Sequence, residues 1–437
     1  MNRSASSKSV GRSGSHKSDK AETILSGALE VFTTYGYAAA SMDRIAAAAG
    51  VSKPTLYSYF QDKEGLFVAL VKQLMKNSEQ LLFRLPDNPE MLASPAKVLH
   101  QMATSVLNEA SQNQSILTLM RLVIGESGKF PELAQTFIRE AHKPLLENLA
   151  HYLAAQSQLQ FPDPMVAARI FAGSLIHYLI VQEMLHGRDI IPLERDRMVN
   201  GLVDLMVAAG STSVPSTFVD QSSQKSVGQP SNQKSGKAGV ILAGAFQVFT
   251  TYGYAAASMA RIAAAAGVSK PTLYSYFEDK EGLFVSLIKQ LMKNSDHFLL
   301  KLPDKTEKPT SPDKMLHQMA TSVLSEASKN KPFLTLIRLI IGESGKFPEL
   351  AQTFIREIQK SRLESLSRYL ETQPQLHFPD PIVAARIFGG ALIHYLIVQE
   401  VLHGKEIVPL ERDRMVDGLI GIMIAAGSCH DATADEC

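Results

Sequence analysis

A short stretch near the N-terminus combines a cation, hydroxyl groups and aromatic rings. It contains, in order, Lys53, Thr55, Tyr57, Ser58 and Tyr59. A lysine ammonium can read guanine O6 and N7, hydroxyls can hold phosphates, and a tyrosine ring can pack on a thymine methyl group. This mixture suits the major groove of DNA. The same spacing also fits an αα-hairpin inside an ordinary helical bundle, with both tyrosines half buried.

The residues before this stretch predict a short helix and a tight turn. Ser41 is a good N-cap for a helix over 42–49, and Gly50 supplies the positive φ that the exit needs. The alanines at 46–49 leave this helix almost no side-chain bulk. A following helix can therefore pack closely against it and protrude.

Two more helices follow. Ser52 or Lys53 caps the first of them, which has Pro54 in its first turn. Together with the preceding helix it forms a predicted helix-turn-helix. Asp62 caps the next helix, whose first-turn N–H groups and Lys63 can hold a phosphate beside the groove.

The chain is one unit written twice. The run that starts at Val31 recurs at Val248, 217 residues later, and the same offset relates Arg121 to Arg338 without any insertion. A period this long indicates a duplicated domain, because solenoid repeats recur at roughly 20 to 50 residues. The apolar positions have helical spacing in both copies, so we predict an all-α protein with nine helices per copy.

Composition predicts where the domains begin and end. Ser-rich or polar stretches at 1–20, 211–237 and 428–437 predict a disordered basic arm, a linker and a disordered tail. Each copy then consists of a helix-turn-helix domain and a larger helical domain. The predicted boundaries are 21–67 and 68–210 in the first copy, and 238–284 and 285–427 in the second.

Bulk composition limits the classes of function. The chain has 437 residues and 47.8 kDa, with 45% hydrophobic and 20% charged residues, as expected for a soluble globular protein. Uninterrupted apolar runs of about 18 residues are lacking, which argues against a membrane partner. The net charge of +1 gives no bulk support for nucleic-acid binding, so any basic surface must be local. Both cysteines lie in the last ten residues and we read no signal peptide, so we expect a cytoplasmic protein.

Parts of the chain resemble a known family. The run from Ala39 to Phe67, like its repeat from Ala256 to Phe284, closely resembles the N-terminal DNA-binding domain of the TetR family of transcriptional regulators. The run from Arg121 to Phe137 is similar to the ligand-binding half of the AefR-like branch. The resemblance implies nine helices per unit, a dimer bound to a double-stranded DNA operator, and a repressor released by a small ligand in the C-terminal half.

The family's DNA contacts fall on matching positions of both copies. These positions are Ser41, Lys53, Thr55, Tyr57, Tyr59 and Lys63, and Ser258, Lys270, Thr272, Tyr274, Tyr276 and Lys280. Where several members place a base-reading arginine, this chain has Asp43 and Ala260. We expect the neighbouring Arg44 and Arg261 to take over phosphate contact, and the operator not to be strictly symmetric.

The last two helices of a unit are the family's dimerising pair. Small residues suit close packing there, namely Ala167, Ala168, Ala172 and Gly173, with Ala384, Ala385, Gly389 and Gly390 in the second copy. The alternative is that they form the core within one unit. As an interface, they would let the two copies pair within one chain, because a linker of about 25 residues spans ~25 to 30 Å as a coil.

Polar groups on otherwise apolar helices are candidates for a ligand pocket. They are His100, Arg121, His177 and Tyr178, with counterparts His317, Arg338, His394 and Tyr395. A mostly apolar cavity uses a few such groups to orient a ligand, so we expect a small hydrophobic effector that is uncharged or weakly anionic. Each of these residues is also compatible with an ordinary core or surface position.

Other motifs suggest catalysis or metal binding, but we predict neither. Glu183 and His186, repeated as Glu400 and His403, have the spacing of di-iron bundles, whose site needs two further glutamates. The run 125–129 lacks the full phosphate-loop pattern. Cys429, His430 and Cys437 could bind a metal or form a redox pair, but we interpret them as part of a loose acidic tail. A helical metal-dependent enzyme and a ligand-independent DNA-binding protein remain the alternatives to a regulator that needs no cofactor.

Overall fold

The computed structural model describes residues 13–82, 94–211, 236–293 and 311–428. In these ranges the regular elements are helices and there is no strand, as predicted. The predicted linker, except for its ends, and the tail with Cys429, His430 and Cys437 lie outside the described residues.

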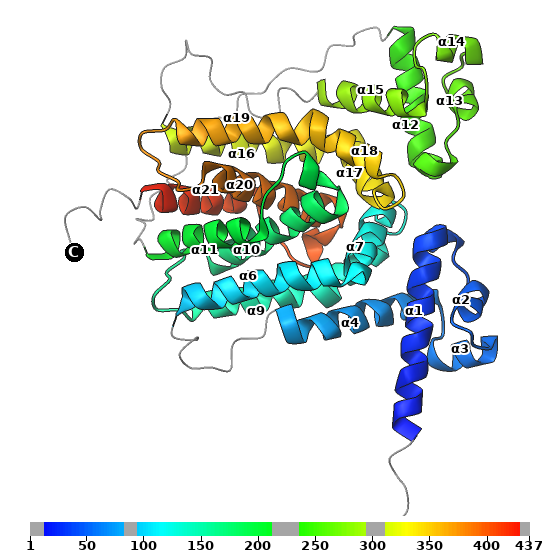
Figure 1. The fold of residues 1–437 in the computed structure, drawn as a ribbon, viewed down its shortest axis with the longest axis horizontal. Coiled ribbons are helices and arrows are strands. Elements are labelled where there is room, and N and C mark those ends of the chain that lie inside the picture. The colour runs from blue at the N-terminus through cyan, green and yellow to red at the C-terminus, as the bar shows by residue number, and fades with distance from the viewer. Residues whose placement is uncertain (1–12, 83–93, 212–235, 294–310, 429–437) are drawn as a thin grey trace, which may run out of the picture.

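The first unit runs from α1 to α11 (Figure 1). Its N-terminal domain, here called the head, contains α1 (Ser13–Ala39), α2 (Met42–Ala48), α3 (Lys53–Tyr59) and α4 (Lys63–Leu82). Its C-terminal domain contains α6 (Pro95–Gln112), α7 (Gln114–Glu126), α8 (Pro131–Phe137), η1 (Ile138–His142), α9 (Lys143–Ala154), α10 (Pro164–Leu179), η2 (Ile180–Met184), η3 (Gly187–Asp189) and α11 (Arg195–Ser211). The π-helical turn η1 joins α8 and α9 into one continuous helix and η2 continues α10, which leaves nine helices in the described part of the unit besides the short turn η3.

The second unit repeats this order. Its head contains α12 (Lys237–Ala256), α13 (Met259–Ala265), α14 (Lys270–Tyr274) and α15 (Lys280–Lys293). Its C-terminal domain contains α16 (Pro312–Lys329), α17 (Lys331–Glu343), α18 (Pro348–Phe354), η4 (Ile355–Gln359), α19 (Lys360–Glu371), α20 (Pro381–Leu396), η5 (Ile397–Val401), η6 (Gly404–Glu406) and α21 (Arg412–Ser428).

The first helix is longer than the sequence indicates. We predicted a disordered arm over 1–20, but α1 begins at Ser13, so residues 13–20 correct that boundary. The extension is polar, which is why its composition resembles an arm. Near its other end, Gly36 has a φ of 77° and kinks the helix, a conformation that glycine adopts readily.

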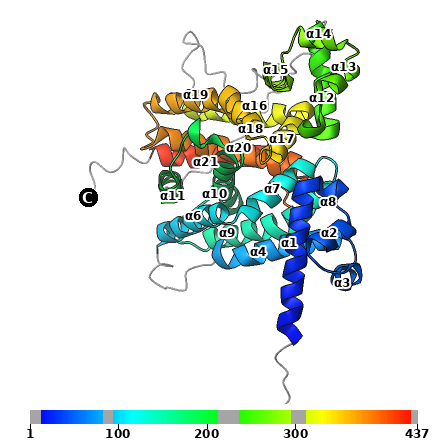
Figure 2. The same ribbon diagram turned by 45° about the vertical axis from the view of Figure 1, so that its right-hand side comes forward.

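Each head is joined to its C-terminal domain by aromatic packing. In the first unit, Tyr37 lies between Phe67 of the head and Phe130 at the start of α8, with ring centroids 5.8 and 5.2 Å away. Tyr254 makes the same contacts in the second unit. Figures 1 and 2 show the two heads apart from each other, at one end of the joined C-terminal domains.

The two C-terminal domains pack through three helix pairs, α10 with α20, α11 with α21, and α7 with α17. Glycines allow the closest approaches. A Cβ atom added to Gly125 would lie 2.8 Å from the Cα of Gly342, and one added to Gly201 would lie 2.6 Å from Val383 of the other unit. Each of these contacts has a counterpart with the units exchanged, so the packing is close to two-fold symmetric.

Arginines add polar contacts between the units. Nη2 of the buried Arg169 donates a hydrogen bond of 2.6 Å to the carbonyl of Val408, and Nη2 of Arg197 donates one of 3.0 Å to the carboxylate of Asp380. Buried arginines need such partners, because an unpaired buried charge is costly.

Two segments have the length and apolar composition of a membrane span, Pro164–Met184 and Pro381–Val401. Neither is an uninterrupted apolar run, because Arg169 lies in the first and Arg386 in the second, but the mean hydropathy of each is high. Most of each segment is covered by other parts of the protein, with 83% and 72% of the apolar window buried. They are the central helices of the two C-terminal domains.

Candidate nucleic-acid interface and effector cavities

The local signals for a helix-turn-helix are confirmed. Ser41 Oγ accepts the N–H of Arg44 at 3.3 Å, and Gly50 has a φ of 64°. Ser52, not Lys53, caps the second helix by accepting the N–H of Thr55 at 3.3 Å. The side chain of Asp62 caps α4 by accepting the N–H of Gly65 at 2.7 Å.

The second helix of each motif presents exposed aromatic rings. Tyr57 is 45% exposed, and its counterpart Tyr274 is 53% exposed. Tyr276 is also exposed, whereas Tyr59 is half buried beside Phe60. An exposed ring on a protruding helix is available to a DNA groove, whereas the half-buried Tyr59 offers less surface to it.

The two heads differ at Lys53 and Lys270. Lys53 Nζ lies 2.7 Å from the carboxylate of Asp43, and this hydrogen bond raises the pKa of Lys53. Ala260 occupies the position of Asp43 in the second head, so it offers no such acceptor to Lys270. Asp43 therefore lies in the motif as expected, but it contacts a lysine that was expected to contact DNA.

Lys63 serves the head itself as well as facing outward. Its ammonium donates to the carbonyls of Tyr37 and Ala40 at 2.7 and 3.2 Å and lies 4.2 Å from the centre of the Tyr37 ring. Lys280 repeats this arrangement. An ammonium has three donors, so one remains for a phosphate.

Sequence reasoning missed a tyrosine in each head. Tyr35 and Tyr252 are 54% and 55% exposed, and the guanidinium groups of Arg44 and Arg261 lie over their rings at 4.7 and 5.0 Å. Stacking holds each arginine at the surface of its head, where it can reach a phosphate. The available signal was the Thr-Thr-Tyr-Gly-Tyr run, which we had used only as evidence for the internal repeat.

Two of the eight predicted pocket residues, Arg121 and Arg338, line a wide cleft of about 800 Å³ among α1, α7, α12 and α17. His100 and His317 are exposed and contact Asn200 and Asp417. The hydroxyls of Tyr178 and Tyr395 each donate to a backbone carbonyl at 2.9 Å. Arg121 and Arg338 join the two units through Ser344 and Ser127 at 3.1 and 3.0 Å. The expectation of a cavity position is therefore corrected for four residues, which lie outside the walls of this cleft and of the two cavities described next: His100, His317, Tyr178 and Tyr395.

The remaining two, His177 and His394, do line cavities, but each lines the cavity of the other unit. A first cavity of about 100 Å³ lies among α6, α7, η1 and α10 and includes His394. A second cavity of about 140 Å³ lies in the second unit and includes His177. Sequence reasoning missed His142, which is buried in the wall of the first cavity and whose ring centroid lies 5.1 Å from that of His394.

The Glu-x-x-His pairs have structural partners. The carboxylate of Glu183 forms ion pairs with Arg188 and Arg195, and a ring nitrogen of His186 lies 3.1 Å from the carbonyl of Ser344 in the other unit. His186 has a φ of 55° and so lies in the left-handed region. Over the described ranges, no group of three or more His, Cys, Asp or Glu side chains is placed to hold a metal ion.

The buried histidines make stability depend on pH. Burial lowers the pKa of His142 and of His177 to about 3, and it also lowers the pKa of His394. In the unfolded chain these groups take up protons near pH 6.5. Between about pH 6.5 and 3 the unfolded state therefore binds more protons than the folded state. As the pH is lowered through this range, we expect the free energy of unfolding to decrease by up to ~1.4 kcal/mol per pH unit for each such histidine.

Urea unfolding at pH 7.5 and pH 5.0 measures this slope. The variant His142→Gln, which places at 142 the residue that the second unit has at Gln359, should have a shallower slope than the wild type. Equal slopes would contradict a neutral, buried His142.

Comparisons with known proteins agree with this architecture. The family described as "Bacterial regulatory proteins, tetR family" matches residues 24–70 and 241–287. The family described as "AefR-like transcriptional repressor, C-terminal domain" matches residues 97–210 and 314–427. In each unit, the first family matches the head and the second matches the C-terminal domain.

Individual relatives match one unit or one head. The regulator RutR of Escherichia coli is 38% identical over 68 residues, 16% of this chain, so the chain spans about a third (32%) of RutR. The uncharacterized regulator YhgD of Bacillus subtilis is 40% identical over 199 residues, which are 44% of this chain and 96% of YhgD. Among solved structures, the flavonoid-responsive regulator FrrA is 29% identical with a TM-score of 0.35, covering 43% of this chain and 92% of FrrA. The chain therefore belongs to the TetR family of DNA-binding transcriptional regulators, with two family units in tandem.

Proposed function

We propose that this regulator is a cytoplasmic repressor that binds its operator as a single-chain pseudo-dimer and is released by a small hydrophobic effector. The two heads contact successive major grooves, roughly 34 to 36 Å apart, as two helix-turn-helix motifs of a dimer do. The effector occupies a cavity of the C-terminal domain. Its binding weakens DNA binding because it favours an arrangement of the heads that fits DNA less well.

Three consecutive residues of α7 carry this proposal. Ile124 lines the first cavity, Gly125 packs against Gly342 of the other unit, and the carboxylate of Glu126 accepts the backbone N–H of Tyr37 at 3.1 Å. A shift of α7 on filling the cavity thus acts on both the partner unit and the head. Lysines add cross-links between units, because Lys346 Nζ donates to the carbonyl of Thr34 at 3.2 Å.

Removing the hydrogen bond between α7 and the head should separate effector binding from DNA release. We expect Glu126→Ala with Glu343→Ala, which removes the matching bond to Tyr254, to leave effector affinity within about twofold. A coupling free energy of about 1 to 3 kcal/mol corresponds to a loss of DNA affinity of about 5- to 150-fold on effector binding. In the variant this loss should be several-fold smaller than in the wild type, since less of the coupling reaches the heads. A compound that stabilises the wild type in a thermal-shift screen serves as effector, and fluorescence anisotropy measures DNA affinity.

Glu147→Ala with Glu364→Ala is the matched control. These two glutamates occupy equivalent exposed positions on α9 and α19. The control pair should respond to the effector as the wild type does. Full release of DNA from the Glu126 and Glu343 variant would contradict this route of coupling.

Sedimentation of the DNA complex tests the pseudo-dimer. At low protein concentration we expect one chain of 47.8 kDa per operator duplex. A stable two-chain assembly with four heads would contradict the proposal. A screen in which every stabilising compound leaves DNA affinity unchanged would instead favour a ligand-independent DNA-binding protein.

A further inference from the structure

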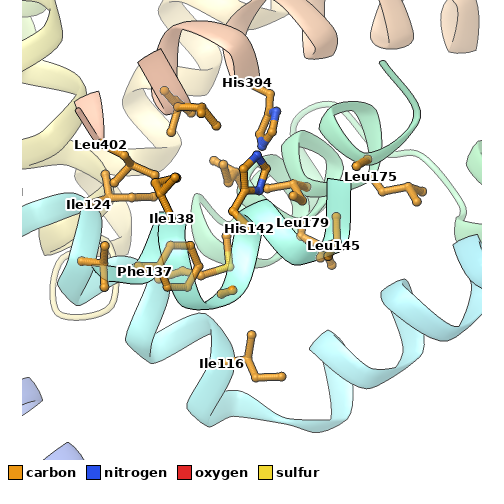
Figure 3. A pocket seen from close by; sticks show the side chains of 18 of the residues that line it. Ile116, Ile124, Phe137, Ile138, His142, Leu145, Leu175, Leu179, His394 and Leu402 are labelled. Atoms are coloured by element: carbon orange, nitrogen blue, oxygen red, sulfur yellow. The ribbon is translucent and has the colours of Figure 1, made fainter. Parts of the chain in front are cut away.

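The first cavity is apolar except for two imidazoles. Figure 3 shows aliphatic and aromatic side chains around it, including Ile116, Phe137 and Leu179. Its volume of about 100 Å³ is of the same order as the ~150 Å³ of an engineered apolar cavity that binds benzene. An occupant of about one ring is therefore the size that this cavity accepts.

The imidazoles come from different units. His142 ends the π-helical turn η1 of the first unit, and His394 reaches in from α20 of the second. Gly173 makes room for this approach, because a Cβ atom there would lie 2.8 Å from Nδ1 of His394. The two rings point toward each other in Figure 3, and the cavity is complete only when both units are in place.

His142 has an unused hydrogen-bonding atom. Both rings are buried, and Nε2 of His142 has no hydrogen-bond partner among the described residues. A buried polar atom without a partner is unfavourable, so a ligand that pairs it gains affinity. The π-helical turn that carries His142 is itself a feature often found at functional sites.

The electrostatics of the site favour a neutral ligand. Burial lowers the pKa of His142 to about 3, so its ring is neutral at physiological pH and offers one donor and one acceptor. The nearest buried cation, Arg169, is not part of the cavity wall and donates to the carbonyl of Val408. An ionised ligand would bring in a charge without a counter-charge in the wall.

We propose that the first cavity binds a neutral, ring-sized apolar molecule with a single hydroxyl group, which hydrogen-bonds between His142 and His394. A hydroxyl both donates and accepts, so it can bridge two neutral imidazoles whichever tautomers they have. This inference rests on the proposed function of the cavity as an effector site and names the class of effector.

The second cavity lacks this arrangement. Gln359 stands in place of His142, Arg362 stands in place of Leu145, and Arg386 also lies in the wall. These cations would favour an anionic group over a neutral hydroxyl. We therefore expect one hydroxyl-specific site per chain.

Calorimetry with the full chain tests the proposal, with phenol, toluene and benzoate as probes. We expect one phenol site per chain, and toluene and benzoate affinities at this site at least about tenfold lower. His142→Gln should weaken phenol binding about tenfold and leave toluene binding unchanged. Toluene or benzoate binding as tightly as phenol, or phenol binding that His142→Gln does not weaken, would overturn the proposal.

Tyr152→Phe is the matched control, because the buried Tyr152 hydroxyl also lacks a hydrogen-bond partner within the described ranges but lies outside the cavity wall. It should bind phenol as the wild type does. If His142→Gln loses its helical circular-dichroism signal, His394→Gln removes the other partner from the second unit and should have the same effect on phenol.

DNA binding is measured separately, so the two proposals can fail separately. Phenol binding that depends on His142 but leaves DNA affinity unchanged would support this site and contradict its role as an effector site. Release of DNA by another compound, with no phenol binding, would contradict only the hydroxyl-specific site.

Discussion

Replacing Tyr57 and Tyr274 by alanine is expected to weaken specific DNA binding about a hundredfold or more. Each ring is about half exposed on the second helix of its motif, so it can reach a base or a phosphate without leaving a hole in the core. A lost base contact costs about 1 to 3 kcal/mol, and two heads lose one each, while every 1.4 kcal/mol is tenfold in affinity. Anisotropy with an operator selected from a random pool, at fixed salt, measures the loss.

The fold of this variant should be intact. We expect unchanged helical circular dichroism and melting, since exposed side chains away from caps and cores contribute little to stability. Tyr57→Phe with Tyr274→Phe then separates ring from hydroxyl, because phenylalanine keeps packing on a thymine methyl but loses a phosphate contact. Undiminished binding by the alanine variant would contradict the assignment of these helices to the groove.

Lys63 is a poorer test of DNA contact, and the structure explains why. Its ammonium bonds to the carbonyls of Tyr37 and Ala40 at the end of α1. Removing it leaves these carbonyls without the lysine donor and takes away one of the contacts between α4 and α1. A Lys63→Ala variant would thus lose stability together with DNA affinity, and the two effects would not be separable.

The helix-turn-helix was predictable because its signals are local. A cap such as Ser41 and a left-handed glycine such as Gly50 act within a few residues of the chain, so their types and spacing predict the observed geometry. The duplication was equally plain from the repeat. Such local signals do not predict which helices pack together when they are more than two hundred residues apart in the sequence. An example is His394 of the second unit, which lines the first cavity.

The cavity was mispredicted for a physical reason. The candidates were chosen as polar residues on otherwise apolar helices, a choice that brought in the exposed His100 and missed the buried His142. The π-helical turn over Ile138–His142 changes the spacing of buried positions, so a period of 3.6 residues misplaces the side chains that follow. The partners of Arg121, Ser344 and the end of η2, were not predictable because they belong to distant segments of the chain.

The unmodified chain is expected to prefer an operator whose two half-sites differ. In the first head the carboxylate of Asp43 holds Lys53 at 2.7 Å, whereas Ala260 offers no acceptor to Lys270. A lysine without this ion pair can turn to guanine O6 and N7, and a good base contact of this kind discriminates by about 1 to 3 kcal/mol. The half-site of the second head should therefore show a guanine preference that the first lacks.

Two reciprocal substitutions test this difference. Asp43→Ala releases Lys53 and should make the operator symmetric, with the second head's half-site on both sides. Ala260→Asp gives Lys270 an aspartate partner like that of Lys53. The preferred operator should again be symmetric, but with the first head's half-site on both sides. Both sites are exposed, so neither change should alter melting. Random-pool selection on the three proteins measures the preferences. A symmetric operator for the unmodified chain, or the same asymmetric operator for all three, would show that the ion pair does not set the half-site difference.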